Sequence, residues 1–115
     1  MTVTIYHNPR CSKSRQTLKL LQDHDVDIAI VEYLKTPPNA EQLSRILALL
    51  DLEPRELMRT GEPAYRENGL DDETLERGEL IEAMIRHPIL IERPIVIADG
   101  KARIGRPPES VLEIL

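Results

Sequence analysis

The chain contains a single cysteine, Cys11, and its neighbours are those of a reactive thiol. An alternating stretch is broken by Asn8-Pro9, and a helix-like run begins at Ser12. The thiol is therefore expected at the start of a helix, where free backbone N–H groups and the helix dipole favour an anion. Arg10 and Lys13 add positive charge on either side. Such surroundings favour the thiolate, which is the nucleophilic form of cysteine.

Further polar residues near Cys11, Asn8 among them, are candidates for supporting roles. Ser14 could donate a hydrogen bond to a thiolate, and Arg15 is the nearest downstream arginine. His7 could donate a proton, but a turn histidine whose ring bonds the backbone fits the sequence equally well. A lone cysteine is commonly a small buried packing residue, which is the alternative for Cys11. The chain break, the helix start and the flanking cations favour the reactive thiol.

The start of a helix that stabilises a thiolate also attracts a phosphate-like oxyanion. Cysteine phosphatases hold phosphate in a loop whose arginine follows the cysteine by six residues, but position 17 is threonine here. With one cysteine the chain forms no internal disulfide, zinc cluster or CxxC pair, so no bound metal or cofactor is expected. Any redox chemistry at Cys11 therefore needs a second thiol from outside.

Apolar patterns and chain breaks predict the elements that position this cysteine. Strands are predicted at 2–6, 27–33, 94–99 and 101–105. Helices are predicted at 12–23, 39–50, 53–60 and 77–86, with a last one that has Pro108 near its start. Asn39 and Gln42 form a capping-box pattern, and Asp99-Gly100 is a strong hairpin signal.

The order of these elements predicts an α/β fold of the thioredoxin type. A βαβ unit and a ββα unit are separated by a helical insertion at about 39–87, and residues 1–115 are expected to form a single domain. In this layout the segment after the first strand lies at the carboxyl edge of the sheet, where ligands of α/β proteins usually bind. Cys11 is in that segment.

Composition narrows the classes of function. A net charge of −5 argues against a general nucleic-acid binder, which needs a basic face for phosphate contacts. No apolar stretch is long enough for a membrane span, and the first residues lack the pattern of a signal peptide. A cytoplasmic location is therefore expected. The protein is also expected to be a monomer. Eleven of the 15 cations are arginines, the side chain that binds oxyanions through paired hydrogen bonds, although most of the eleven are expected to be solvated surface charges.

Four segments resemble the glutaredoxin-dependent arsenate reductase family, and in particular its short arsenate-reductase-like members. The segments read YHNPRCSKSRQTL, ELMRTGEPAY, HPILIERPIV and IGRPPESVLEIL, in that order along the chain. The resemblance extends from Thr4 to Leu115. The string HNPxCxxSR and the segments ERPIV and GRPPE, in the correct order, together make it highly specific.

The resemblance implies that Cys11 attacks arsenate and forms a thiol–arsenate adduct. Glutathione would then release arsenite as a co-substrate, and glutaredoxin would resolve the resulting mixed disulfide. The family's three arginines fall on Arg59, Arg93 and Arg106, which would bind the oxyanion. The family's fold also implies a cis peptide bond before Pro94, facing the thiol. Spacing alone does not select these three arginines from the eleven.

Two other functions remain open at the level of sequence. Spx-like transcription regulators share the fold and bind RNA polymerase, but they typically carry CxxC, and Ser14 occupies the second cysteine position here. A thiol-redox module with another substrate is also compatible with Cys11, but it leaves the arginines without a role. The arginines therefore favour the enzyme.

Overall fold

The computed structural model describes residues 2–115, and the chain forms two compact units. The sheet unit combines the segment up to Thr36 with Arg93–Leu115, and the helical unit is Pro37–Glu92. The second unit is thus inserted between the two halves of the first. Whether the two behave as a single domain stays a prediction.

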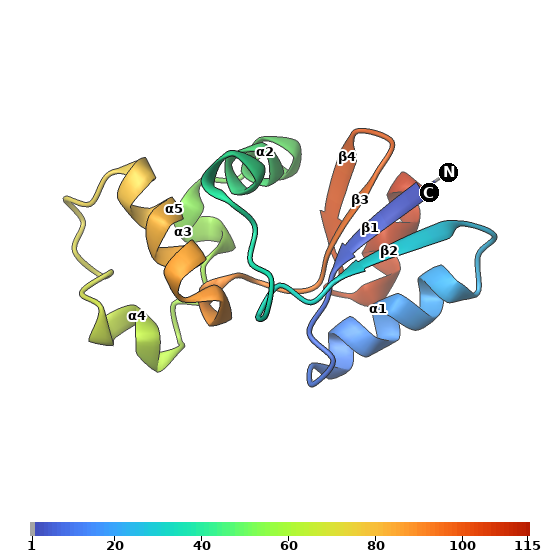
Figure 1. Cartoon of the computed structure of the whole chain (residues 1–115), viewed down its shortest axis with the longest axis horizontal. Helices are drawn as coiled ribbons and strands as arrows, with labels where there is room; N and C mark the ends of the chain where they lie inside the picture. Colours follow the sequence, from blue (N-terminus) through green and yellow to red (C-terminus); the bar gives the residue numbers. More distant parts are fainter. Residues whose placement is uncertain (1) are drawn as a thin grey trace. The chain divides into compact units, whose positions relative to one another are not determined.

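The sheet unit contains four strands in the order β2-β1-β3-β4 (Figure 1). Their bounds are β1 (Thr2–Tyr6), β2 (Asp27–Val31), β3 (Ile95–Ala98) and β4 (Lys101–Ile104). Strand β1 pairs parallel with β2, whereas the β1–β3 and β3–β4 pairs are antiparallel. Helix α1 (Ser12–Gln22) connects β1 to β2, as a parallel pair requires. This is the βαβ and ββ arrangement that the sequence predicted.

One face of this sheet is covered by α1 and by the 3-10 helix η2 (Pro108–Ile114). Alternation along β1 places Val3 and Ile5 on that face, and both are fully buried. They pack with Leu21 of α1 and Val111 of η2. The predicted last helix is therefore real, but it is a 3-10 helix.

The turn between β3 and β4 is the predicted hairpin turn. Asp99 and Gly100 have φ angles of 51° and 73°, and two successive positive φ angles are what a type I′ turn requires. Asp tolerates this region and Gly adopts it without steric cost, which is why this pair closes the hairpin.

The helical unit contains four α-helices and one 3-10 helix within Pro37–Glu92. These are α2 (Ala40–Leu50), α3 (Pro54–Leu57), α4 (Pro63–Glu67), α5 (Arg77–Arg86) and η1 (Pro88–Leu90). The capping box of α2 is confirmed, because Asn39 Oδ1 accepts from Gln42 N at 2.8 Å and Gln42 Oε1 accepts from Asn39 N at 2.9 Å.

Two features of this unit differ from the expectation. The helix predicted at 53–60 ends at Leu57, because Met58 turns extended and forms an isolated bridge with Ile91. Helix α4 was not predicted.

Among residues 2–115 no helix combines the length and apolarity that crossing a membrane would take.

Candidate active site

The loop that leads into the thiol is held in shape by hydrogen bonds to its backbone groups. Cys11 N donates to Asn8 O at 3.0 Å, and Arg10 N donates to Asn8 Oδ1 at 3.0 Å. From helix α1, Arg15 Nη1 donates to Pro9 O at 2.9 Å. Asn8 and Arg15 therefore hold the shape of the loop, and their supporting roles in the chemistry stay a prediction.

His7 and Ser14 form a buried pair beneath this loop. His7 Nδ1 lies 2.6 Å from Ser14 Oγ, and the same hydroxyl accepts from Asn8 N at 3.0 Å. The sequence suggested that Ser14 could donate to the thiolate, but its hydroxyl contacts the ring of His7 and the backbone N–H of Asn8. His7 is likewise not a simple turn histidine bonded to backbone through its ring. Burial lowers the pKa of His7, with a further lowering by Arg15 and an opposing effect of Glu32.

The lowered pKa of His7 predicts a pH dependence of stability. Because the folded protein binds a proton at His7 less readily than the unfolded chain does, its contribution is present above about pH 6.5 and is lost as the pH falls through the lower folded value. Urea unfolding at a series of pH values should show the free energy of unfolding decreasing over this range, and His7→Gln should flatten the decrease. The exposed His24 provides the matched control, His24→Gln, which should keep the wild-type slope. An unchanged slope in His7→Gln would contradict the assignment.

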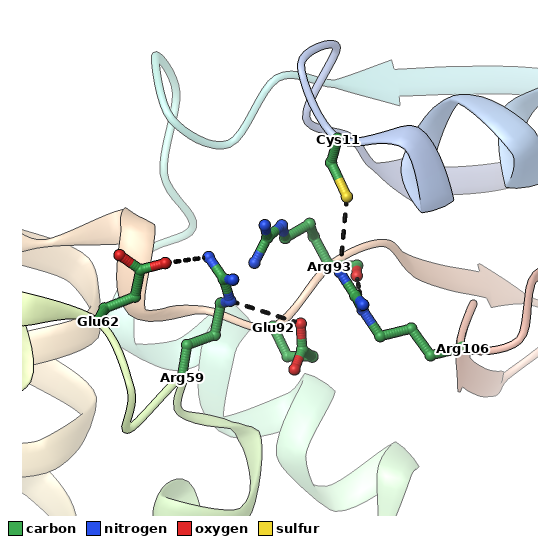
Figure 2. Close-up of polar contacts among 6 residues, drawn as sticks. All are labelled: Cys11, Arg59, Glu62, Glu92, Arg93 and Arg106. Atoms are coloured by element: carbon green, nitrogen blue, oxygen red, sulfur yellow. Dashed lines mark hydrogen bonds and ion pairs between the residues drawn. The ribbon is translucent and has the colours of Figure 1, made fainter.

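Cys11 is the N-cap residue of α1, as the sequence predicted. The residue is 8% exposed, and Arg106 Nη2 lies 3.5 Å from Cys11 Sγ (Figure 2). Arg106 is held in turn by Nε, which donates to Arg93 O at 2.8 Å. The thiol thus has a helix N-terminus on one side and a guanidinium on another, and both favour a bound oxyanion.

Pro94 and Gly105 fix the segments that carry Arg93 and Arg106. The Arg93-Pro94 peptide bond is cis, which confirms the prediction, and Arg106-Pro107 is also cis, which was not predicted. Gly105 N donates to Pro94 O at 2.9 Å. A Cβ at Gly105 would lie 2.7 Å from Pro94 Cγ and 2.4 Å from Thr17 Oγ1, so the two segments approach α1 as closely as only glycine allows.

Arg59 belongs to the helical unit, where two carboxylates surround it. Its Nη1 lies 2.5 Å from Glu62 Oε1, and its Nε lies 3.8 Å from Glu92 Oε1 (Figure 2). Its backbone N donates to Leu90 O at 2.7 Å, which continues the bridge between Met58 and Ile91. The Arg59 side chain as a whole is 24% exposed.

The sheet unit therefore contains all the candidate residues except Arg59. These are His7, Asn8, Cys11, Ser14, Arg15, Arg93, Pro94 and Arg106. A cradle formed by Arg59, Arg93 and Arg106 together stays a prediction. Sequence reasoning missed Glu62 and Glu92, although one signal was present, since Glu62 follows Arg59 by three residues.

The described residues limit what else the site could hold. Within residues 2–115 no three histidine, cysteine or acidic side chains gather as metal ligands would. What the sheet unit offers is a nucleophilic sulfur at a helix start with a guanidinium in hydrogen-bonding range. This combination suits attack by sulfur on a tetrahedral oxyanion.

Known proteins resemble this chain in sequence and in fold. The sequence matches the ArsC family over residues 6–114. The uncharacterized protein YfgD of Escherichia coli (strain K12) is 55% identical, over 98% of this chain and 96% of its own length. The arsenate reductase of Haemophilus influenzae is 47% identical over 100% of both chains. The structure of an arsenate reductase from Vibrio cholerae matches with a TM-score of 0.96 and 52% identity, covering 100% of this chain and 98% of that one. The thioredoxin-like fold is thereby confirmed.

Proposed function

Because the chain belongs to the ArsC family, we propose that it reduces arsenate to arsenite, with Cys11 as nucleophile and glutathione as the second thiol. The observation that carries the proposal is the contact of 3.5 Å between Arg106 Nη2 and Cys11 Sγ at the start of α1. Relatives named arsenate reductase align with this chain over its full length, which supports arsenate as the substrate.

The proposed reaction begins with the Cys11 thiolate attacking arsenic. A sulfur–arsenic bond forms, and one arsenate oxygen leaves as water after taking up protons. The positive charge of Arg106 stabilises the oxyanion during this step, and Arg93 and Arg59 are proposed to share its remaining oxygens. Arsenic is still pentavalent in the adduct, so no electrons have yet been transferred.

The second step needs a sulfur that this chain does not have. Glutathione thiolate attacks Cys11 Sγ and forms a disulfide, and the electron pair of the sulfur–arsenic bond stays on arsenic, which leaves as arsenite. Two thiols are oxidised to one disulfide and arsenic gains two electrons. Glutaredoxin then reduces the mixed disulfide between Cys11 and glutathione.

A hollow beside the thiol loop supports a peptide-like thiol as reductant. It has a volume of about 330 Å³ and is lined by residues of the loop at 7–10 and of the segment at 32–35. Arg10 and Lys35 provide positive charge there and Glu32 provides negative charge. Glutathione carries two carboxylates and one ammonium group, which matches these signs.

The experiment that tests the function is a coupled assay of NADPH oxidation with arsenate, glutathione, glutaredoxin and glutathione reductase. Arsenate-dependent oxidation is expected, and intact mass after arsenate and glutathione should show one glutathione per chain. The matched comparison replaces the glutathione components by thioredoxin and thioredoxin reductase and should show no sustained turnover. Turnover with thioredoxin alone would contradict the glutathione step, and no arsenate-dependent oxidation in either system would contradict the function.

Lysine substitution is expected to impair the oxyanion site even though it keeps the charge. Arg59→Lys, Arg93→Lys and Arg106→Lys should each lower kcat/KM for arsenate by about tenfold or more, because an ammonium group cannot make the paired hydrogen bonds of a guanidinium. Steady-state kinetics measures this, with the exposed Arg66→Lys as a control that should match wild type. Wild-type kcat/KM in any of the three variants removes that arginine from the site.

A further inference from the structure

The pairing of Arg59 with carboxylates is unusual for a residue that binds an anion. Glu62 and Glu92 place two negative charges beside one guanidinium, and all three side chains are at most 28% exposed. Like charges in such a partly buried setting repel more strongly than in water. An oxyanion that approaches Arg59 therefore meets a carboxylate as well as a cation.

The position of Glu62 is fixed by the local chain. It is the N-cap residue of α4, but its side chain makes no capping hydrogen bond. Its backbone N donates to Arg59 O at 3.1 Å, and the turn so formed brings the two side chains together. At the corresponding position of α2, Asn39 does cap its helix. The carboxylate of Glu62 is thus directed to Arg59 and not to its own helix.

The contacts of Arg59 leave one part of its guanidinium for another ligand. Glu62 engages Nη1 and Glu92 lies near Nε, whereas no contact within residues 2–115 is recorded for Nη2. A ligand oxygen bound at Nη2 lies next to the Nη1 group and hence close to the carboxylate of Glu62. A bare anionic oxygen there is repelled, but a hydroxyl can donate a hydrogen bond to the carboxylate.

We propose that Glu62 makes the oxyanion site select ligands that carry a hydroxyl. Arsenate and phosphate keep at least one proton near neutral pH, whereas sulfate has none. A site in which a protein group accepts a hydrogen bond from the ligand discriminates strongly against an analogue that lacks the donor. Glu62 is then a positioning and selectivity residue, and the inference rests on the proposed function in requiring that Arg59 contacts the oxyanion.

The test compares inhibition of arsenate reduction by sulfate and by phosphate. Wild type should be inhibited by sulfate far more weakly than by phosphate. Glu62→Gln keeps the shape of the side chain, and its amide can donate a hydrogen bond to an unprotonated oxygen. In this variant the inhibition constant for sulfate should therefore fall by about tenfold, while the inhibition constant for phosphate changes little. Glu73→Gln, at an exposed position in the same unit, removes the same charge and should behave as wild type.

A second variant separates selectivity from a structural role. Glu62→Asp keeps the charge and should keep the weak inhibition by sulfate. Equal shifts of both inhibition constants in Glu62→Gln, no shift in either, or loss of discrimination in Glu62→Asp would overturn the proposal. If the protein does not reduce arsenate at all, protection of Cys11 from alkylation by the same two anions gives the comparison without turnover, so failure of the function and of the selectivity are told apart.

Discussion

Replacing Cys11 by serine is expected to abolish arsenate reduction, with kcat lower by about three orders of magnitude or more. A serine hydroxyl is almost fully protonated near neutral pH, so neither the helix start nor Arg106 can supply a useful fraction of the nucleophile. Serine also forms no disulfide, so the step that transfers electrons to arsenic has no equivalent.

The coupled assay measures this loss, and intact-mass analysis after arsenate and glutathione should show the unmodified chain. Ser12→Ala, at an exposed position next to Cys11, is a matched control that should keep activity. Because serine is nearly the same size as the buried cysteine it replaces, thermal unfolding close to wild type is expected. Residual activity of Cys11→Ser within tenfold of wild type would contradict the assigned nucleophile.

A second large effect is expected on stability. Gly105→Ala places a methyl group 2.4 Å from Thr17 Oγ1 and 2.7 Å from Pro94 Cγ, and both neighbours are buried. Since neither neighbour is the end of a long flexible side chain, the backbone must move, and overpacking of this kind costs about 1 to 3 kcal/mol. Thermal unfolding should show a Tm lower by several degrees or more.

The effect should extend to activity because of where Gly105 lies in the chain. It immediately precedes Arg106 and donates its backbone N–H to Pro94, next to Arg93. A shift of this contact moves both arginines. Gly78→Ala in α5 is the matched control: no atom lies within 4 Å of the added methyl group, so the free energy of unfolding should be unchanged or slightly higher. A Tm of Gly105→Ala equal to wild type would show that the close approach is not needed.

Most of the fold could be predicted because its elements carry local signals. The alternation of Val3 and Ile5, the cap at Asn39 and the turn at Asp99-Gly100 each appear in the structure where the sequence placed them. Helix α4 was missed because Tyr65 is its one buried residue, so there is no apolar period to detect.

The end of helix α3 and the helix type of η2 depended on less obvious signals. Helix α3 stops at Leu57 because residue 58 pairs with Ile91, a partner that no local pattern reveals. In η2 the buried residues are Pro108, Val111 and Ile114, a spacing of three that fits the three residues per turn of a 3-10 helix. That spacing was visible in the sequence and could have been read this way.

For the candidate site, the sequence was informative about the thiol and much less so about its partners. The place of Cys11 at the start of α1 could be predicted from the break before it and the helix after it. Arg106 is 95 residues away along the chain, so nothing nearby marks it as a neighbour of the thiol. Only the resemblance of whole segments to a family selected it. Glu62 was overlooked because a carboxylate is not expected next to an arginine that is proposed to bind an anion.

The division of the sheet unit into two chain segments has a consequence for biosynthesis. A ribosome completes β1, the thiol loop, α1 and β2 well before it reaches Arg93, so the cysteine exists for a time without Arg93 or Arg106. During that interval β1 also lacks its antiparallel neighbour β3, and the nascent chain exposes an unpaired strand edge. A chain that ends prematurely in the helical unit would keep the thiol but lack the guanidinium groups of Arg93 and Arg106. The order of translation thus makes the late segment, and not the cysteine, the part that completes the candidate site residues of the sheet unit.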